Sequence, residues 1–285
     1  MRNSLSSVAC LAITAALWGT SVAATTESAP ADASATELAK QTQNPVANLI
    51  SVPFQHNFNF NTGPEDKTVW VLNVQPVIPI PLGDDWNLIT RWITPIINQP
   101  ELAPGTDEAF GLGDINPSFF LSPAGSKEFI WGFGPTFTFP TATSRELGAG
   151  KWSLGPTAVA LTMQGPWVVG ALINNQWSVA GWGDKNVNQM LLQPFVNYNF
   201  DKGWYLTSAP ILTANWEADG GDQWTVPIGM GAGRLFRLRD LLGAGIGGLG
   251  KLPINTSLQA YWNAVTPDFG PDWQLRFQVQ FLFPR

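Results

Sequence analysis

The side chain best suited to catalysis is His56, the single histidine of the 285-residue sequence. A histidine-assisted hydrolase needs a serine or similar nucleophile within hydrogen-bond reach of the imidazole. His56 is followed by Asn57 and Phe58, and the nearest candidates on the adjoining segment are Thr68 and Trp70. We therefore interpret His56 as a packing residue and predict no catalytic residues, with a lipid-modifying enzyme as the least favoured alternative.

Metal, cofactor and nucleic-acid sites are not expected either. The only cysteine, Cys10, lies in an N-terminal apolar segment, so neither a thiol nor a second imidazole completes a zinc-type site. Glycine-rich stretches at 111–113 and 243–250 precede no phosphate-binding helix. The formal net charge is −6, whereas binding of nucleic acid requires a basic surface.

Two charged residues lie among neutral polar ones and are candidates for a solute path. Asp114 alternates in phase with Asn116 and Ser118, and Arg276 alternates in phase with three glutamines. A charge in a confined interior is costly unless it has a partner. We expect Asp114 and Arg276 to set a constriction, paired directly or through neighbouring amides, with Arg91 as a competing partner.

These candidates belong to segments in which apolar and polar residues alternate strictly. From 273 to 283 the odd positions are apolar and most even positions are glutamine, whereas in 50–60 asparagine and glutamine occupy odd positions. A period of two predicts strands with one apolar face. Twelve such segments are expected, at about 48–61, 67–80, 86–99, 110–121, 129–140, 151–164, 167–180, 188–200, 204–216, 223–236, 252–263 and 273–283; the phase of 86–99 is ambiguous because both faces are apolar.

Three features favour an all-β transmembrane barrel over a soluble sandwich. The segments exceed the usual strand length of about 5 or 6 residues and match tilted membrane strands. Their polar face is neutral rather than charged, and only 13% of all residues are charged. Tryptophans lie at segment ends, as in the aromatic girdles of membrane barrels: Trp70, Trp86, Trp131, Trp152, Trp167, Trp204, Trp224, Trp262 and Trp273. The prediction is an antiparallel up-and-down barrel of about twelve strands.

An even strand number places both ends of the barrel on the periplasmic side. The odd-numbered connections (62–66, 99–109, 141–150, 181–187, 217–222 and 264–271) would then face outward, and they are strongly acidic. The remaining connections are short except 237–251, a glycine-rich stretch expected to extend the flanking strands or to form a lid on the inner side.

The N-terminus has the features of an export signal. Arg2 precedes an apolar stretch, 8–18, that is too short to span a bilayer, and Ser21-Val22-Ala23 supplies small residues for signal peptidase. Lipid attachment at Cys10 fits poorly, because the small residues 7–9 precede the apolar core instead of following it. We predict a signal peptide at 1–23, a flexible periplasmic leader at 24–47 and an outer-membrane barrel at 48–285.

Several motifs resemble a proteobacterial outer-membrane family of assumed transporters, related to the phenol-degradation meta-pathway proteins and often mislabelled "neuromedin U". The matching motifs include Asn44–Gln55, Gly111–Asp114, Phe119–Pro123, Phe139–Thr143, Gly150–Ser153, Gly155–Ala158, Gln193–Phe195, Gln223–Ile228 and Leu282–Arg285. The resemblance spans nearly the whole chain after the signal peptide. It implies an outer-membrane barrel with a transport role and supplies no catalytic residues.

The predicted function is passive passage of small solutes, hydrophobic or aromatic compounds among them, through a narrow lumen. The alternative is a non-transporting barrel that acts in structure or binding through its acidic loops. The expected partners are outer-membrane lipid, lipopolysaccharide and the barrel-assembly machinery, in a Gram-negative outer membrane. By strand phase, the predicted pore-lining residues are Gln55, Asn57, Asn59, Asn73, Gln75, Asp114, Asn116, Gln193, Asn197, Asn255, Gln259, Gln274, Arg276, Gln278 and Gln280.

Overall fold

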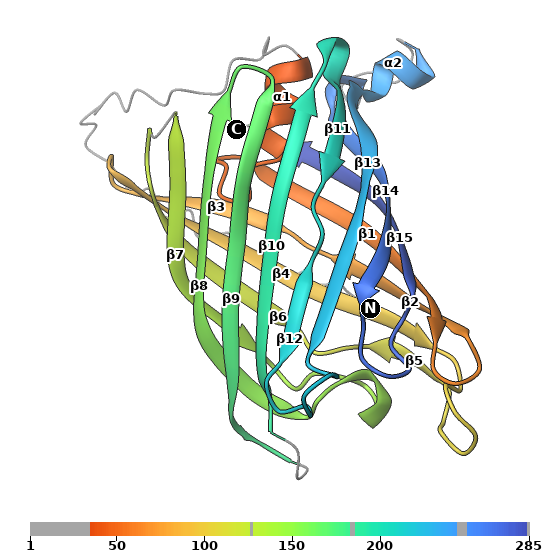
Figure 1. The fold of residues 1–285 in the computed structure, drawn as a ribbon. Coiled ribbons are helices and arrows are strands. Elements are labelled where there is room, and N and C mark those ends of the chain that lie inside the picture. The colour runs from red at the N-terminus through yellow and green to blue at the C-terminus, as the bar shows by residue number, and fades with distance from the viewer. Residues whose placement is uncertain (1–34, 126–127, 183–185, 244–249, 284–285) are drawn as a thin grey trace, which may run out of the picture.

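The chain folds into a single antiparallel sheet that closes on itself (Figure 1). The computed structural model describes residues 35–125, 128–182, 186–243 and 250–283, so the predicted signal peptide lies outside the described residues. The strands are β1 (Ile50–Thr62), β2 (Lys67–Val74), β3 (Val77–Leu82), β4 (Trp86–Gln99), β5 (Ala109–Leu112), β6 (Asn116–Pro123), β7 (Phe129–Thr138), β8 (Lys151–Gln164), β9 (Trp167–Gly181), β10 (Asn188–Asn199), β11 (Trp204–Ser208), β12 (Leu212–Asn215), β13 (Trp224–Arg237), β14 (Pro253–Val265) and β15 (Trp273–Phe283).

Twelve strands cross the barrel wall, because three of the crossings are interrupted. β2 and β3, β5 and β6, and β11 and β12 are successive pieces of one crossing each, since both pieces pair with the same neighbouring strands. Pro76 and Pro210 lie in two of the gaps, where a residue without an N–H cannot continue the ladder. The first and last strands pair from Ile50–Phe283 to Phe60–Trp273 and close the barrel. The predicted all-β barrel of about twelve strands is confirmed.

The two ends of the barrel differ. One end, here named the α1 end, holds the short turns, helix α1 (Ala35–Thr42) and helix α2 (Leu238–Leu242), both drawn at the top of Figure 1. The other, the loop end, holds the long acidic connections and the 3-10 turn η1 (Arg145–Leu147). A second 3-10 turn, η2 (Asp201–Gly203), joins β10 to β11. Of the glycine-rich connection 237–251, the described part forms α2; residues 244–249 lie outside the described residues.

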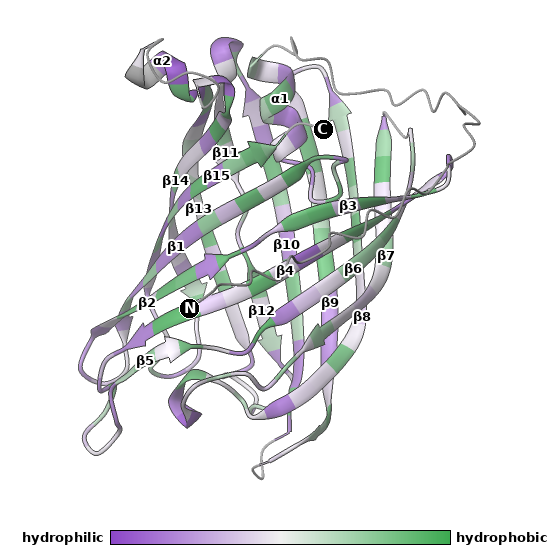
Figure 2. Cartoon of the chain, turned by 180° about the vertical axis from the view of Figure 1, so that it is seen from behind, coloured by the Kyte–Doolittle hydropathy of each residue, from purple (hydrophilic) through white to green (hydrophobic). Residues whose placement is uncertain are grey.

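The outer wall is apolar and carries the predicted aromatic belts. Hydrophobic residues alternate with polar ones along the strands, as Figure 2 shows. Most of the predicted girdle tryptophans are exposed on this wall: Trp86, Trp167 and Trp204 begin strands at the α1 end, and Trp152, Trp262 and Trp273 lie at the loop end. Exposed ring bodies at two levels are typical of barrels that cross a membrane. None of the described helices has the length and apolar character to span a bilayer.

The prediction of a flexible leader at 24–47 is wrong for its C-terminal half. Residues 35–42 form α1, whose Leu38 and Ala39 are buried against Tyr205, Leu235 and Leu282 inside the α1 end. The chain then enters the barrel, where Val46 packs in a second apolar cluster. Isolated helices this short are marginal in water, so docking in the barrel supplies the stability that the sequence of α1 alone does not.

Candidate channel lumen

All fifteen residues that were predicted to line a pore lie on the inner face of the barrel. In β1, Gln55 and Asn57 are buried while their neighbours in sequence are less so, and Asn73 lies directly opposite Gln55. Several members of the set bond to one another: Gln274 Nε2 donates to Asn59 Oδ1 at 2.9 Å, and Asn255 Nδ2 donates to Gln280 Oε1 at 3.1 Å. Passage of solute along this lining is a prediction.

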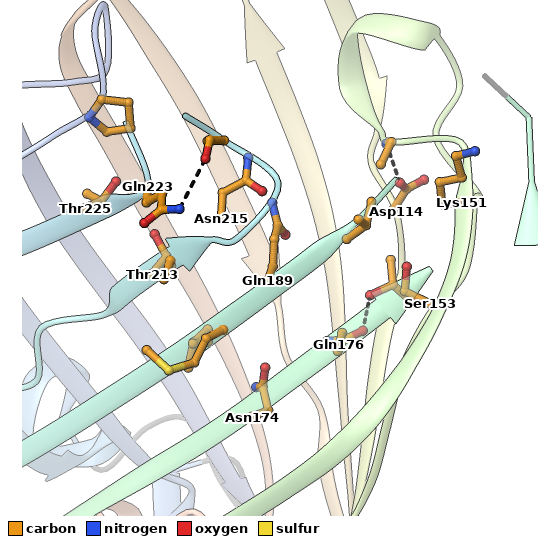
Figure 3. A pocket seen from close by; sticks show the side chains of 18 of the residues that line it. Asp114, Lys151, Ser153, Asn174, Gln176, Gln189, Thr213, Asn215, Gln223 and Thr225 are labelled. Atoms are coloured by element: carbon orange, nitrogen blue, oxygen red, sulfur yellow. Dashed lines mark hydrogen bonds between the residues drawn. The ribbon is translucent and has the colours of Figure 1, made fainter. Parts of the chain in front are cut away.

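The loop end opens into a vestibule of about 730 Å³. Polar side chains from β9, β10, β12 and β13 surround it, among them Asn174, Gln189, Thr213 and Thr225 (Figure 3). Three aspartates (Asp114, Asp222 and Asp268) and Lys151 complete its charged lining. A cavity of this size, with neutral and mostly acidic walls, can hold a hydrated small solute.

Asp114 accepts hydrogen bonds from the backbone at the rim of the vestibule and forms no ion pair with Arg276. Its Oδ1 accepts a hydrogen bond from the backbone N–H of Ala142 at 3.1 Å, and its Oδ2 accepts one from that of Ala149 at 2.8 Å. No ion pair within 4 Å joins Asp114 to Arg276. The predicted pairing of these two charges, direct or through neighbouring amides, is not found among the described residues, because strand phase gives the face of a residue but not its distance from a residue on another strand.

Arg276 lies deep in the barrel and is 2% exposed. Its guanidinium donates to Asn57 Oδ1 at 3.3 Å, to the carbonyl of Ala209 at 2.9 Å and to Gln274 Oε1 at 3.0 Å. The same group lies 5.0 Å above the ring of Tyr261. Because the Ala209 carbonyl belongs to the gap between β11 and β12, Arg276 ties β15 to that interrupted crossing and narrows the lumen.

Arg91, whose strand phase was ambiguous, also faces inward. Its Nη2 donates to Gln75 Oε1 at 2.7 Å, and it lines a cavity of about 140 Å³ between the lumen wall and the leader. Gln193, Gln278 and Gln280 lie on the same cavity. This cavity is the innermost space of the lumen at the α1 end.

The leader closes the α1 end below this cavity. Gln43 and Asn199 exchange two amide hydrogen bonds of 2.9 and 3.0 Å, and Asn255 Nδ2 donates to Thr42 Oγ1 at 3.2 Å. Pro45, Ala47 and Leu49 cover one side of the cavity. With the leader docked, this cavity is covered by residues 41–49 on its α1 side.

Part of the inner wall is apolar, which the strand patterns did not reveal. Ile89 and Phe120 are fully buried and directly paired, and they belong to a cluster on one side of the lumen that is completed by Val46, Ile130, Val159, Leu161, Val168, Leu172 and Phe195. The signal was present in sequence as apolar residues on both faces of 86–99. Those residues are consistent with a wall that meets lipid outside and apolar side chains inside.

His56 lies on the outer wall and contacts aromatic residues. Its Nδ1 accepts a hydrogen bond of 3.3 Å from Trp70 Nε1, and its ring stacks between Trp70 and Phe277 at centroid distances of 5.8 and 6.1 Å. Its direct neighbours across the two adjoining strands are Leu72 and Phe277. These contacts fit the packing role predicted for His56. Among the described residues no cluster of three histidine, cysteine, aspartate or glutamate side chains could hold a metal ion.

The contacts of Asp114 predict a specific loss of order at the rim. Asp114→Asn should remove one of two charge-assisted hydrogen bonds, each worth about 1.5–3 kcal/mol, and loosen loop 141–150. Trypsin should then cleave after Arg145 several-fold faster than in the unmodified chain. Asp219→Asn, a change in another loop of the same end, is the control and should leave this rate unchanged. Equal cleavage rates for Asp114→Asn and the unmodified chain would disprove the role of Asp114.

Comparison with known proteins identifies the fold. No family model and no curated protein sequence matches the chain. An outer membrane channel from Pseudomonas putida F1 is similar in structure, with 16% identity, a TM-score of 0.60 and coverage of 82% of this chain and 94% of that chain. The NanC porin has 7% identity and a TM-score of 0.49, and the match covers 83% of this chain and 100% of that chain. Outer membrane phospholipase A from Escherichia coli has 11% identity and a TM-score of 0.40, and the match covers 88% of this chain and 99% of that chain. The chain shares its fold with the Pseudomonas putida channel.

Proposed function

We propose that this protein is a Gram-negative outer-membrane channel through which small solutes pass by diffusion. The observation that carries the proposal is the largely polar inner face, which opens into a vestibule of about 730 Å³ at the loop end. Twelve strands give a lumen between the filled interior of eight-stranded barrels and the wide channel of porins. The shared fold with an outer membrane channel supports the same conclusion.

The fifteen inner-face residues are the proposed pore lining, and the apolar strip beside them tunes the choice of solute. Ile89, Phe120 and Phe195 offer contacts for the apolar part of a solute, which supports passage of hydrophobic or aromatic compounds. Residues 1–23 direct export, lipid and lipopolysaccharide surround the apolar wall, and the barrel-assembly machinery inserts it. The paired ends of the barrel, Ile50 and Phe283, lie on the periplasmic side in this proposal, so that the loop end faces outward.

Thiol accessibility in lipid vesicles tests whether the lumen is an aqueous path. A membrane-impermeant maleimide should modify Gln189→Cys rapidly, because Gln189 lines the vestibule. It should modify Gln193→Cys once residues 24–47 are deleted, because the leader covers the cavity that Gln193 lines. Leu192→Cys is the matched control: Leu192 pairs with the exposed Ile173 on the outer wall and should stay unmodified. A Gln193→Cys that never reacts would favour a barrel that binds ligands at its loops without transport.

A further inference from the structure

Arg91 is a partly buried cation whose hydrogen-bonding capacity is mostly unused. A guanidinium has five N–H donors. One nitrogen of Arg91 donates to the neutral oxygen of Gln75, and no other hydrogen bond joins the Arg91 side chain to the described residues. Arg276, in contrast, uses three nitrogens and a ring contact. Arg91 therefore has more unused donors than Arg276, all three of whose nitrogens are engaged.

No carboxylate neutralises either arginine. Neither Arg91 nor Arg276 has an aspartate or glutamate oxygen within 4 Å among the described residues. A charge taken out of water is strongly unfavourable unless an opposite charge compensates it. The lumen thus holds one buried positive charge, Arg276, and one partly buried positive charge, Arg91, and no carboxylate of the described residues pairs with either.

The cavity beside Arg91 has the size and donors to hold a small anion. Its volume of about 140 Å³ exceeds that of a single water, about 30 Å³. No acidic residue is part of its lining. Gln193 and Gln278 also line it, and their side-chain amides bond to none of the described residues. Two free amides and a guanidinium with spare donors form a recognition set for oxyanions and halides.

We propose that this cavity is a binding site for a small anion, either an inorganic ion or a simple carboxylate, held by Arg91 with Gln193 and Gln278. The bound anion compensates the charge of Arg91, which lines the cavity. Its consequence for transport, a preference of the channel for anionic solutes, rests on the proposed channel function, whereas the binding itself does not. The acidic vestibule lies outside this site, because its aspartates line the separate cavity at the loop end.

The test is anion-dependent stability of the full mature chain in detergent. The folded fraction after heating is read from gel mobility and gives the temperature at which half of the protein is unfolded. This temperature should rise with the concentration of chloride or acetate, compared with a bulky sulfonate at the same ionic strength. Arg91→Gln should abolish this shift, and Arg91→Lys should retain part of it. Arg234→Gln, which removes a cation from the outer wall, is the control and should keep the whole shift.

The separate chloride and acetate series show whether the site prefers the inorganic ion or the carboxylate. If Arg91→Gln does not fold, Gln278→Leu replaces it and should weaken the anion dependence several-fold. No anion-specific shift in the unmodified chain, or an equal shift in Arg91→Gln, would overturn the site. Because stability is the readout, an anion shift without any current would retain the site and reject the channel.

Discussion

Deleting residues 24–47 should raise the flux of small solutes through the barrel several-fold. Residues 35–47 of this segment pack in the α1 end, where Leu38 and Ala39 are buried and Val46 reaches the apolar cluster on the lumen wall. Burial of Leu38 or Val46 contributes about 1.5–3 kcal/mol each, so the docked segment stays in place most of the time. Swelling of liposomes in an isotonic solution of a small sugar measures the change.

The barrel should survive this deletion. The ladder that closes it runs from Ile50–Phe283 to Phe60–Trp273 and includes no residue of the leader. A crosslinked chain provides the control: Gln43→Cys and Asn199→Cys, bridged by a short bismaleimide, replace the amide pair that joins the leader to β10. The bridged chain should swell liposomes no faster than the unmodified one. Unchanged swelling after deletion would show that the leader does not close the path.

Arginine at Leu192 should destabilise the folded barrel by about 2–4 kcal/mol, the cost of a cation on the lipid-facing wall near the bilayer midplane. Leu192 lies on the outer face because it pairs with Ile173, which is exposed. Gln189→Arg, three residues away on the same strand, is the matched control: its side chain enters the vestibule beside three aspartates and should cost far less. Urea unfolding in lipid vesicles measures both. Equal costs would mean that the register of β10 is wrong.

The strands that the sequence predicted best are those whose two faces differ in polarity. β1 and β15 alternate between aromatic and amide residues, so phase alone assigned their inner residues and their pairing. The inner and outer faces of β4 could not be assigned from its sequence, because Ile89 packs against Phe120 inside the barrel while the opposite face meets lipid. A period-two pattern carries no information where both environments are apolar.

The parts that escaped prediction depend on contacts between distant segments. α1 is too short to be stable alone, and its burial against Tyr205, Leu235 and Leu282 becomes visible only once the barrel is closed. Asp114 and Arg276 were assigned to the correct face, but β15 and the start of β6 are separated in the sheet by β1, β2 and β4. The spare donors of Arg91 likewise require the three-dimensional position of Gln75 and of the leader.

Single-channel recording in planar lipid bilayers, with the full mature chain and the chain lacking 24–47 measured side by side, tests the central claim most directly. A polar lumen closed at one end by a docked segment predicts rare or small current steps for the full chain and larger, longer-lived steps after the deletion. Absence of current steps in both chains, with folded barrels verified by gel mobility, would contradict the account.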